Sequence, residues 1–142
     1  MNTFVLLLGP PLLSALIALA VKPYRPVVGW ANVLLSLVSL GAAVVLWRHI
    51  LAGDVVTSGP REFLRADALS VLLALCVATV GMLSAWLGPG LHGDDGYDSA
   101  QARKFRIYGN LFTLTMLFAV TSNNVGFMWI AIEATTITSA ML

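Results

Sequence analysis

Glu133 is the residue whose position most directly suggests chemistry. It is the only ionisable side chain in the run from residue 128 to residue 137, which is apolar enough to lie inside a lipid bilayer. A carboxylate near the bilayer centre costs about 3 kcal/mol on insertion scales and more by other estimates, so it is usually kept for a function. The function most often found is the movement of protons or ions.

Glu133 is expected near the middle of a helix that begins after Asn124. It lies nine residues past Asn124, which at 1.5 Å per residue is about 13 Å into a hydrocarbon core of about 30 Å. Helical spacing gathers one stripe of mostly small and polar residues around it: Trp129, Glu133, Thr136 and Ala140. Because of this composition, we expect the stripe to face protein.

Other polar residues could support a path through Glu133, although each also has a structural explanation. Four hydroxyl residues follow it closely, and three of them are candidates for such support: Thr135, Thr136 and Ser139. Hydroxyls in membrane helices usually bond to a carbonyl one turn earlier and let helices approach closely. Asp67 stands at the start of an apolar stretch near Arg65, where a carboxylate suits a helix N-terminus. Glu133 itself could be a neutral side chain that hydrogen-bonds to a neighbouring helix as part of the packing.

The composition is that of a membrane protein. Of the 142 residues, 58% are hydrophobic and 11% are charged, whereas about a quarter are charged in a soluble domain. A net charge of +1 gives no basic surface for nucleic acid. The single Cys76 excludes an internal disulfide, and the spacing of His49 and His92 predicts no metal site. With no phosphate-binding loop or nucleophile motif, we expect neither catalytic residues nor a cofactor.

Five apolar stretches predict an all-α integral membrane fold with about five transmembrane helices. A spanning helix needs about 20 mostly apolar residues, and the stretches that meet or nearly meet this length are residues 3–21, 27–47, 67–87, 107–121 and 125–142. Between the second and third stretches, the connection is long enough for a small hairpin. Pro10 and Pro11 remove two amide donors from the first helix, which is tolerated when neighbouring helices or small polar side chains satisfy the freed carbonyls.

The distribution of basic residues predicts the orientation. The first and third connections carry five of them: Lys22, Arg25, Arg103, Lys104 and Arg106. The second connection carries three: Arg48, Arg61 and Arg65. The positive-inside rule therefore places the amino terminus outside. The three basic residues just before the fourth stretch could meet anionic lipid headgroups.

The second half of the sequence resembles a known family. The segments that carry the resemblance are NLFTLTML at residues 110–117, TSNN at 121–124 and MWIAIEATT at 128–136, followed by Ser139 and Ala140. They resemble the antiporter-like membrane subunits of complex I, and most closely the antiporter-like component of hydrogenase-4 and formate hydrogenlyase-type complexes. Upstream, residues 65–70 look like the family's stretch that opens the third helix, with Ala68 where glycine is common.

The resemblance implies a role for Glu133 and a set of partners. In the family, the corresponding glutamate belongs to a chain of buried ionisable residues and pairs with a lysine on a later, interrupted helix. Proton movement is coupled to redox chemistry in other subunits, which carry the nickel, iron-sulfur clusters and flavin. The resemblance therefore implies a non-catalytic, multi-pass subunit of the inner (cytoplasmic) membrane, bound to other membrane and peripheral subunits of a hydrogenase or complex I-like assembly.

The resemblance also predicts that the sequence is an amino-terminal fragment. Family members have several hundred residues and about fourteen helices arranged with an inverted repeat, whereas this sequence stops at Leu142 in an apolar run. Residues 1–106 would carry the first three helices and their loops, and residues 107–142 the truncated start of the antiporter-like repeat. Two alternatives stay open: a subunit of a multisubunit sodium/proton antiporter, and a membrane scaffold that transports nothing.

Overall fold

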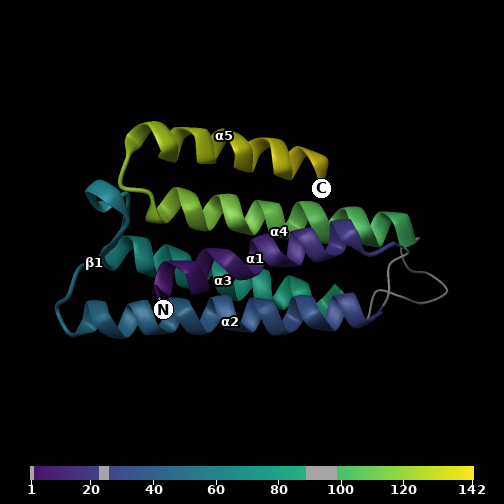
Figure 1. Cartoon of the computed structure of the whole chain (residues 1–142), viewed down its shortest axis with the longest axis horizontal. Helices are drawn as coiled ribbons and strands as arrows, with labels where there is room; N and C mark the ends of the chain where they lie inside the picture. Colours follow the sequence, from purple (N-terminus) through teal and green to yellow (C-terminus); the bar gives the residue numbers. More distant parts are fainter. Residues whose placement is uncertain (1, 23–25, 89–98) are drawn as a thin grey trace.

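The computed structural model describes residues 2–22, 26–88 and 99–142, and it is an all-α membrane bundle with one small hairpin. Its helices are α1 (Thr3–Ala20), α2 (Pro26–Leu51), α3 (Ala68–Leu87), α4 (Ser99–Thr121) and α5 (Val125–Met141). All five run roughly along one long axis (Figure 1). Three described helices are long and apolar enough to cross a membrane, namely Thr3–Ala20, Val27–Leu51 and Ala68–Leu87, and α5 is a shorter apolar helix. The predicted fold class is confirmed.

The fourth helix is longer than the sequence predicts. It begins at Ser99 rather than at residue 107, so Arg103, Lys104 and Arg106 lie within its first turns. Hydropathy underestimates such a helix because Gln, Arg and Lys are good helix formers although they are polar. The consequence is that three basic side chains project from a regular helix rather than from a loop.

The first helix continues through Pro10 and Pro11 because a neighbour satisfies a carbonyl that they free. Pro11 lies four residues after Leu7, so it has no N–H to bond the Leu7 carbonyl. The Ser39 hydroxyl of α2 donates to that carbonyl at 2.6 Å, and Ser39 is buried. The expected compensation by a small polar side chain is confirmed here.

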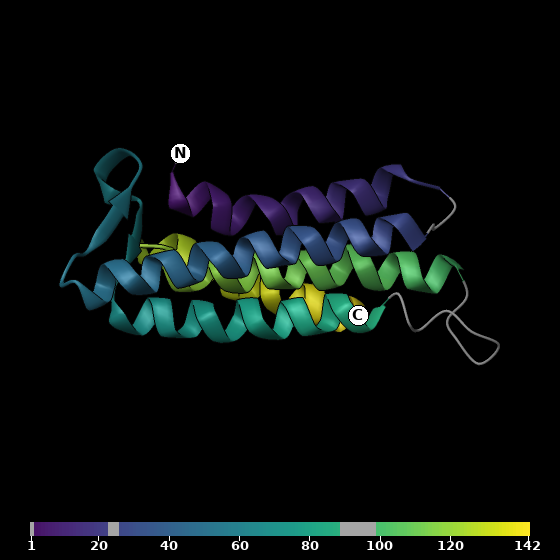
Figure 2. The same ribbon diagram turned by 90° about the horizontal axis from the view of Figure 1, so that it is seen from below.

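The core lies between α1, α2, α3 and α4. The first helix packs on α2 and α4, while α3 packs on α2 and α4. Small residues let the backbones approach closely, and the buried cluster combines alanines with a few large side chains: Phe4, Leu7, Ala42, Ala43, Leu46, Val71, Ala74, Ala78 and Leu117. The fifth helix lies outside this group and packs mainly on α4 (Figures 1 and 2).

The predicted hairpin is present between α2 and α3. Strands β1 (Val56–Ser58) and β2 (Leu64–Ala66) pair antiparallel, with a single 3₁₀ turn at Pro60–Glu62 between them. Gly59 has a φ of 86°, which favours glycine because it has no Cβ. The Asn2 side chain, which caps α1, also donates to the Ser58 hydroxyl. The hairpin therefore joins the start of α1 to the end of the bundle at which α5 begins (Figure 2).

Candidate functional site

The fifth helix starts at a turn that its own side chains define. The Asn124 side chain accepts hydrogen bonds from the amides of Gly126 at 2.9 Å and Phe127 at 3.4 Å. Asparagine is a favoured N-cap because its oxygen satisfies amides that have no partner inside the helix. The turn therefore fixes where α5 begins and, with it, the depth of Glu133.

The hairpin holds this turn in place. The Asn123 amide donates to the Phe63 carbonyl, and its side chain donates to the Glu62 carbonyl, both at 2.9 Å. The Phe63 ring lies 4.9 Å from the Phe127 ring in an edge-to-face contact and 6.0 Å from the Phe118 ring. Contacts from residues 62–63 to both α4 and α5 therefore set the angle at which α5 leaves the bundle.

Small residues form the contact between α5 and α4. Ala131 is buried, and the Thr135 hydroxyl lies 3.0 Å from the Thr115 hydroxyl of α4. Thr135 also donates to the Ala131 carbonyl at 2.9 Å, as Thr138 does to the Ala134 carbonyl. Positions 131, 135 and 138 follow the helical period, so this spacing in the sequence could have identified the packed face.

The stripe with Glu133 faces away from the rest of the chain. Glu133, Thr136 and Ala140 are exposed, and Trp129 is 65% exposed. The expectation that this stripe faces protein is wrong within this chain, because α5 uses its Ala131 side to reach α4. Across the part of the chain that the structure describes, Glu133 has no hydrogen-bond or ion-pair partner.

The supporting hydroxyls have the local bonds expected of membrane helices. Thr136 donates to the Ile132 carbonyl at 3.2 Å on the exposed side, and Thr135 makes the contact to α4 already described. Ser139 is exposed. Of the three, Thr136 and Ser139 therefore share the outward side of α5 with Glu133, whereas Thr135 belongs to the packed side.

Asp67 lies on a different element and caps α3. Its carboxylate accepts from the Ser70 amide at 2.8 Å. The hydrogen bonds from Ser70 and the positive charge of Arg65 lower the pKa of the Asp67 carboxyl below its ordinary value of 3.8, against a smaller opposing effect of burial. The expected helix-start position near Arg65 is confirmed, and this carboxylate is held in its charged form.

A second polar region, which the sequence patterns did not predict, is centred on Arg106. Its guanidinium donates to the Ala85 carbonyl at 3.2 Å near the end of α3, and the side chain is only 4% exposed. Arg103, one turn earlier, donates to the carbonyls of Ala18 at 2.9 Å and Leu19 at 2.6 Å at the end of α1. Cations are favourable at helix C-termini because the last carbonyls lack partners there.

These contacts correct the expectation for Arg106, which is buried and donates to the end of α3. Arg103 is half-buried and donates to the end of α1, while Lys104 is exposed. A Cβ added at Gly88 would overlap the Arg106 guanidinium, so glycine leaves room for it. A sequence signal for the region did exist, since Asn32, Ser36 and Ser39 recur at helical spacing inside an apolar stretch.

Comparison with known proteins supports the resemblance to complex I-type subunits. No protein-family model matches the chain. It is similar to NADH-quinone oxidoreductase subunit L of Pseudomonas aeruginosa strain PAO1, with 33% identity over 104 residues. The match covers 70% of this chain and 15% of that subunit, so the chain spans a small part of the relative's length. Within the described residues, no group of three or more His, Cys, Asp or Glu side chains could hold a metal ion.

Proposed function

We propose that this chain supplies the first five helices of a proton-translocating membrane subunit in a complex I-like assembly, of the kind found in hydrogenase-4 and related group 4 NiFe hydrogenase complexes. The similarity to NADH-quinone oxidoreductase subunit L supports the complex I-like part of the proposal. In such an assembly the subunit is not catalytic. It couples redox chemistry carried by other subunits to the movement of protons.

The observation that carries the proposal is the exposure of Glu133 on the outward side of α5. A carboxylate facing lipid near the middle of a bilayer costs several kcal/mol. That cost falls when another protein element covers the side chain and brings an opposite charge. We therefore propose that a helix with a lysine packs on the Glu133 side of α5 and that the pair is one step of the proton path.

Two further parts of the proposal concern arrangement. Residues 1–106 supply the first three transmembrane helices with their connecting loops, and residues 107–142 begin the antiporter-like repeat. The protein lies in the inner membrane with its amino terminus outside. The end of α1 and the start of α4, which carry Lys22 and Lys104 near them, lie at the same end of the bundle and support a shared cytoplasmic side (Figure 1).

Replacement of one carboxylate in the assembled complex tests the proposal. Glu133→Gln keeps the size of the side chain and removes its charge, so we expect redox-driven proton translocation to be lost while the complex still assembles. Glu62→Gln is the matched control, because Glu62 is exposed in the hairpin turn outside the apolar helices. Proton uptake is measured in vesicles with a pH-sensitive dye, and assembly by co-purification of the other subunits.

The alternatives predict different outcomes of the same measurements. A sodium/proton antiporter subunit would give Glu133-dependent exchange driven by a sodium gradient, without a redox substrate. A scaffold would leave translocation unchanged in Glu133→Gln. The scaffold is a serious candidate for the isolated chain, since Glu133 has no partner among the described residues. Unchanged translocation in the assembled complex would overturn the proposed role of Glu133.

A further inference from the structure

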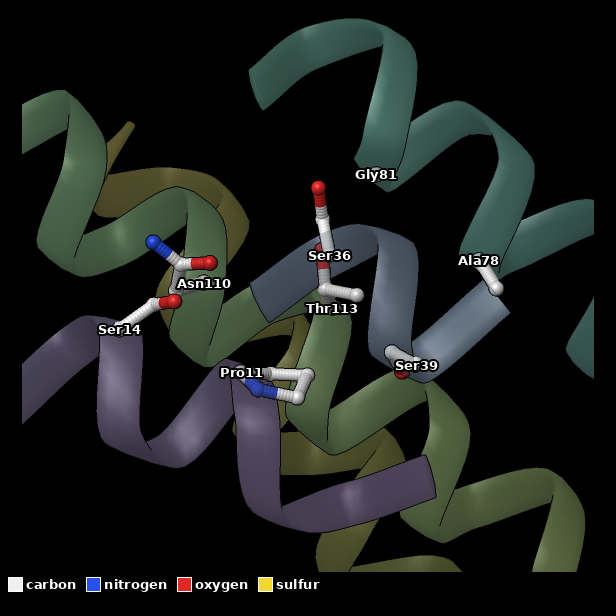
Figure 3. A pocket seen from close by; sticks show the side chains of 8 residues that line it. All are labelled: Pro11, Ser14, Ser36, Ser39, Ala78, Gly81, Asn110 and Thr113. Atoms are coloured by element: carbon white, nitrogen blue, oxygen red, sulfur yellow. The ribbon is translucent and has the colours of Figure 1, made fainter. Parts of the chain in front are cut away.

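The interior of the α1–α4 bundle contains two small polar cavities that share part of their walls. One has a volume of about 10 Å³ and is lined by side chains of all four helices, including Ser14, Ser36, Ser39 and Asn110 (Figure 3). The other, of about 30 Å³, is lined by Asn32, Ser84 and Arg106 among others. Gly81, Asn110 and Thr113 line both cavities. The two cavities are therefore neighbours, and together they make up a polar region inside the bundle.

Three buried polar atoms of these walls have no hydrogen-bond partner in the described part of the chain. They are the Ser14 hydroxyl oxygen, the Asn32 side-chain oxygen and one terminal nitrogen of Arg106. Their side chains are 4%, 6% and 4% exposed. Native proteins rarely leave such groups unpaired, because each one loses its hydration without replacement. Something that both donates and accepts hydrogen bonds must therefore satisfy them.

The polarity and the size of the cavities indicate which kind of molecule could occupy them. Arg106 offers a donor and Asn32 an acceptor on the wall of the larger cavity, whose volume exceeds the roughly 10–15 Å³ that one water needs. The Asn110 nitrogen already donates to the Arg106 carbonyl at 2.7 Å, so its side-chain oxygen is free to accept. Asn110 and Ser14 both line the smaller cavity, and their side chains come from α4 and α1 (Figure 3).

We propose that bound water fills this region and bridges Arg106, Asn32, Asn110 and Ser14. Every wall group is then satisfied: water accepts from the guanidinium, donates to the two amide oxygens, and exchanges a hydrogen bond with the serine. No Asp, Glu, His or Lys side chain of the described residues lines either cavity. An arginine in the wall of a cavity acts as an electrostatic barrier to protons. The water is thus structural and separate from any path through Glu133.

Water-edited solid-state NMR of the full chain in lipid bilayers tests the proposal directly. Polarisation from water protons should reach the Asn32 and Ser14 side chains several-fold sooner than it reaches the Ala74 methyl. Ala74 is a suitable dry reference because it is fully buried in the apolar cluster. If Asn32 and Ser14 are polarised no sooner than Ala74, the region is dry and the proposal is overturned.

A matched pair of serine variants gives a second measurement. The Ser39 hydroxyl has a protein acceptor, the Leu7 carbonyl, so Ser39→Ala should lower the midpoint of thermal unfolding. If water satisfies Ser14, then Ser14→Ala also removes a hydrogen bond and should lower the midpoint. If the site is dry, the same change removes an unpaired polar group, and the midpoint should rise or stay the same. A rise or no change in Ser14→Ala would therefore contradict the proposal, and circular dichroism checks that both variants keep their helix content.

Discussion

Two polar regions of this protein differ in whether the chain itself covers them. Around Arg106, polar side chains point into the α1–α4 bundle, and protein carbonyls accept the bonds of both Arg103 and Arg106. Around Glu133, the polar side chains point out of the bundle, and the carboxylate has no partner among the described residues. A charge that the chain encloses contributes to its own packing. A charge that the chain leaves uncovered is open to contact with another protein element, as we propose for Glu133.

The largest expected change in stability comes from replacement of the exposed Glu133. In the isolated chain, Glu133→Leu should raise the free energy of unfolding by up to about 3 kcal/mol, because it removes a carboxyl group that faces lipid. The measurement is SDS-driven unfolding in mixed micelles, followed by helix content. Glu62→Leu in the exposed turn serves as the control and should change little. A loss of stability in Glu133→Leu would mean that the carboxylate has a partner within the chain, and the comparison would fail.

Replacement of the buried Arg106 should lower the stability of the chain, whereas replacement of Glu133 should raise it. Arg106→Met keeps much of the side-chain volume but removes the hydrogen bond to the Ala85 carbonyl, which is then left without that donor. We expect the free energy of unfolding to fall by about 1–3 kcal/mol, the usual cost of unpaired buried groups. Lys104→Met is the matched control, since Lys104 is exposed on the same helix. Equal effects of the two substitutions would show that burial of Arg106 contributes nothing.

The contribution of Asp67 to the stability of the chain should depend on pH. Because its pKa is lowered in the folded state, it stabilises the protein above its ordinary pKa of 3.8, and this stabilisation is lost as the pH falls through the lower folded value. Asp67→Ala should cost about 1 kcal/mol at neutral pH through loss of the N-cap. Asp67→Asn keeps a capping oxygen but does not titrate. Unfolding measured from pH 6 downward should therefore show this loss in the wild type and not in Asp67→Asn.

The smallest effect concerns the packed side of α5. Thr135→Val removes the contact with Thr115 and should cost about 0.6 kcal/mol, the average for hydrogen bonds between membrane helices. Thr136→Val on the outward side loses only a bond within its own helix and should cost less. SDS-driven unfolding compares the two. If Thr136→Val were the more damaging, the assignment of packed and outward sides would be reversed.

Sequence patterns predicted where most helices and the hairpin lie, but they did not predict which side of α5 packs against the rest of the chain. The helices around the apolar stretches, the hairpin and the start of α3 at Asp67 all follow local signals: length, glycine and proline positions, and a capping carboxylate. The start of α4 was missed because its first turns are polar. The stripe around Glu133 was assigned to a protein contact because it is polar, yet α5 packs through Ala131 and Thr135. The role of Glu133 in a proton path stays a prediction.

The sequence by itself determined that the chain lies in a membrane and where its helices run, because hydropathy and cap chemistry act over a few residues. Only the tertiary structure decided that Arg103 and Arg106 bind the ends of α1 and α3, and that Glu133 points away from the bundle. The physical reason is that lipid is as apolar as leucine, so a membrane helix need not present an apolar side to its neighbours. The side it presents depends on close packing and hydrogen bonds between residues far apart in the chain.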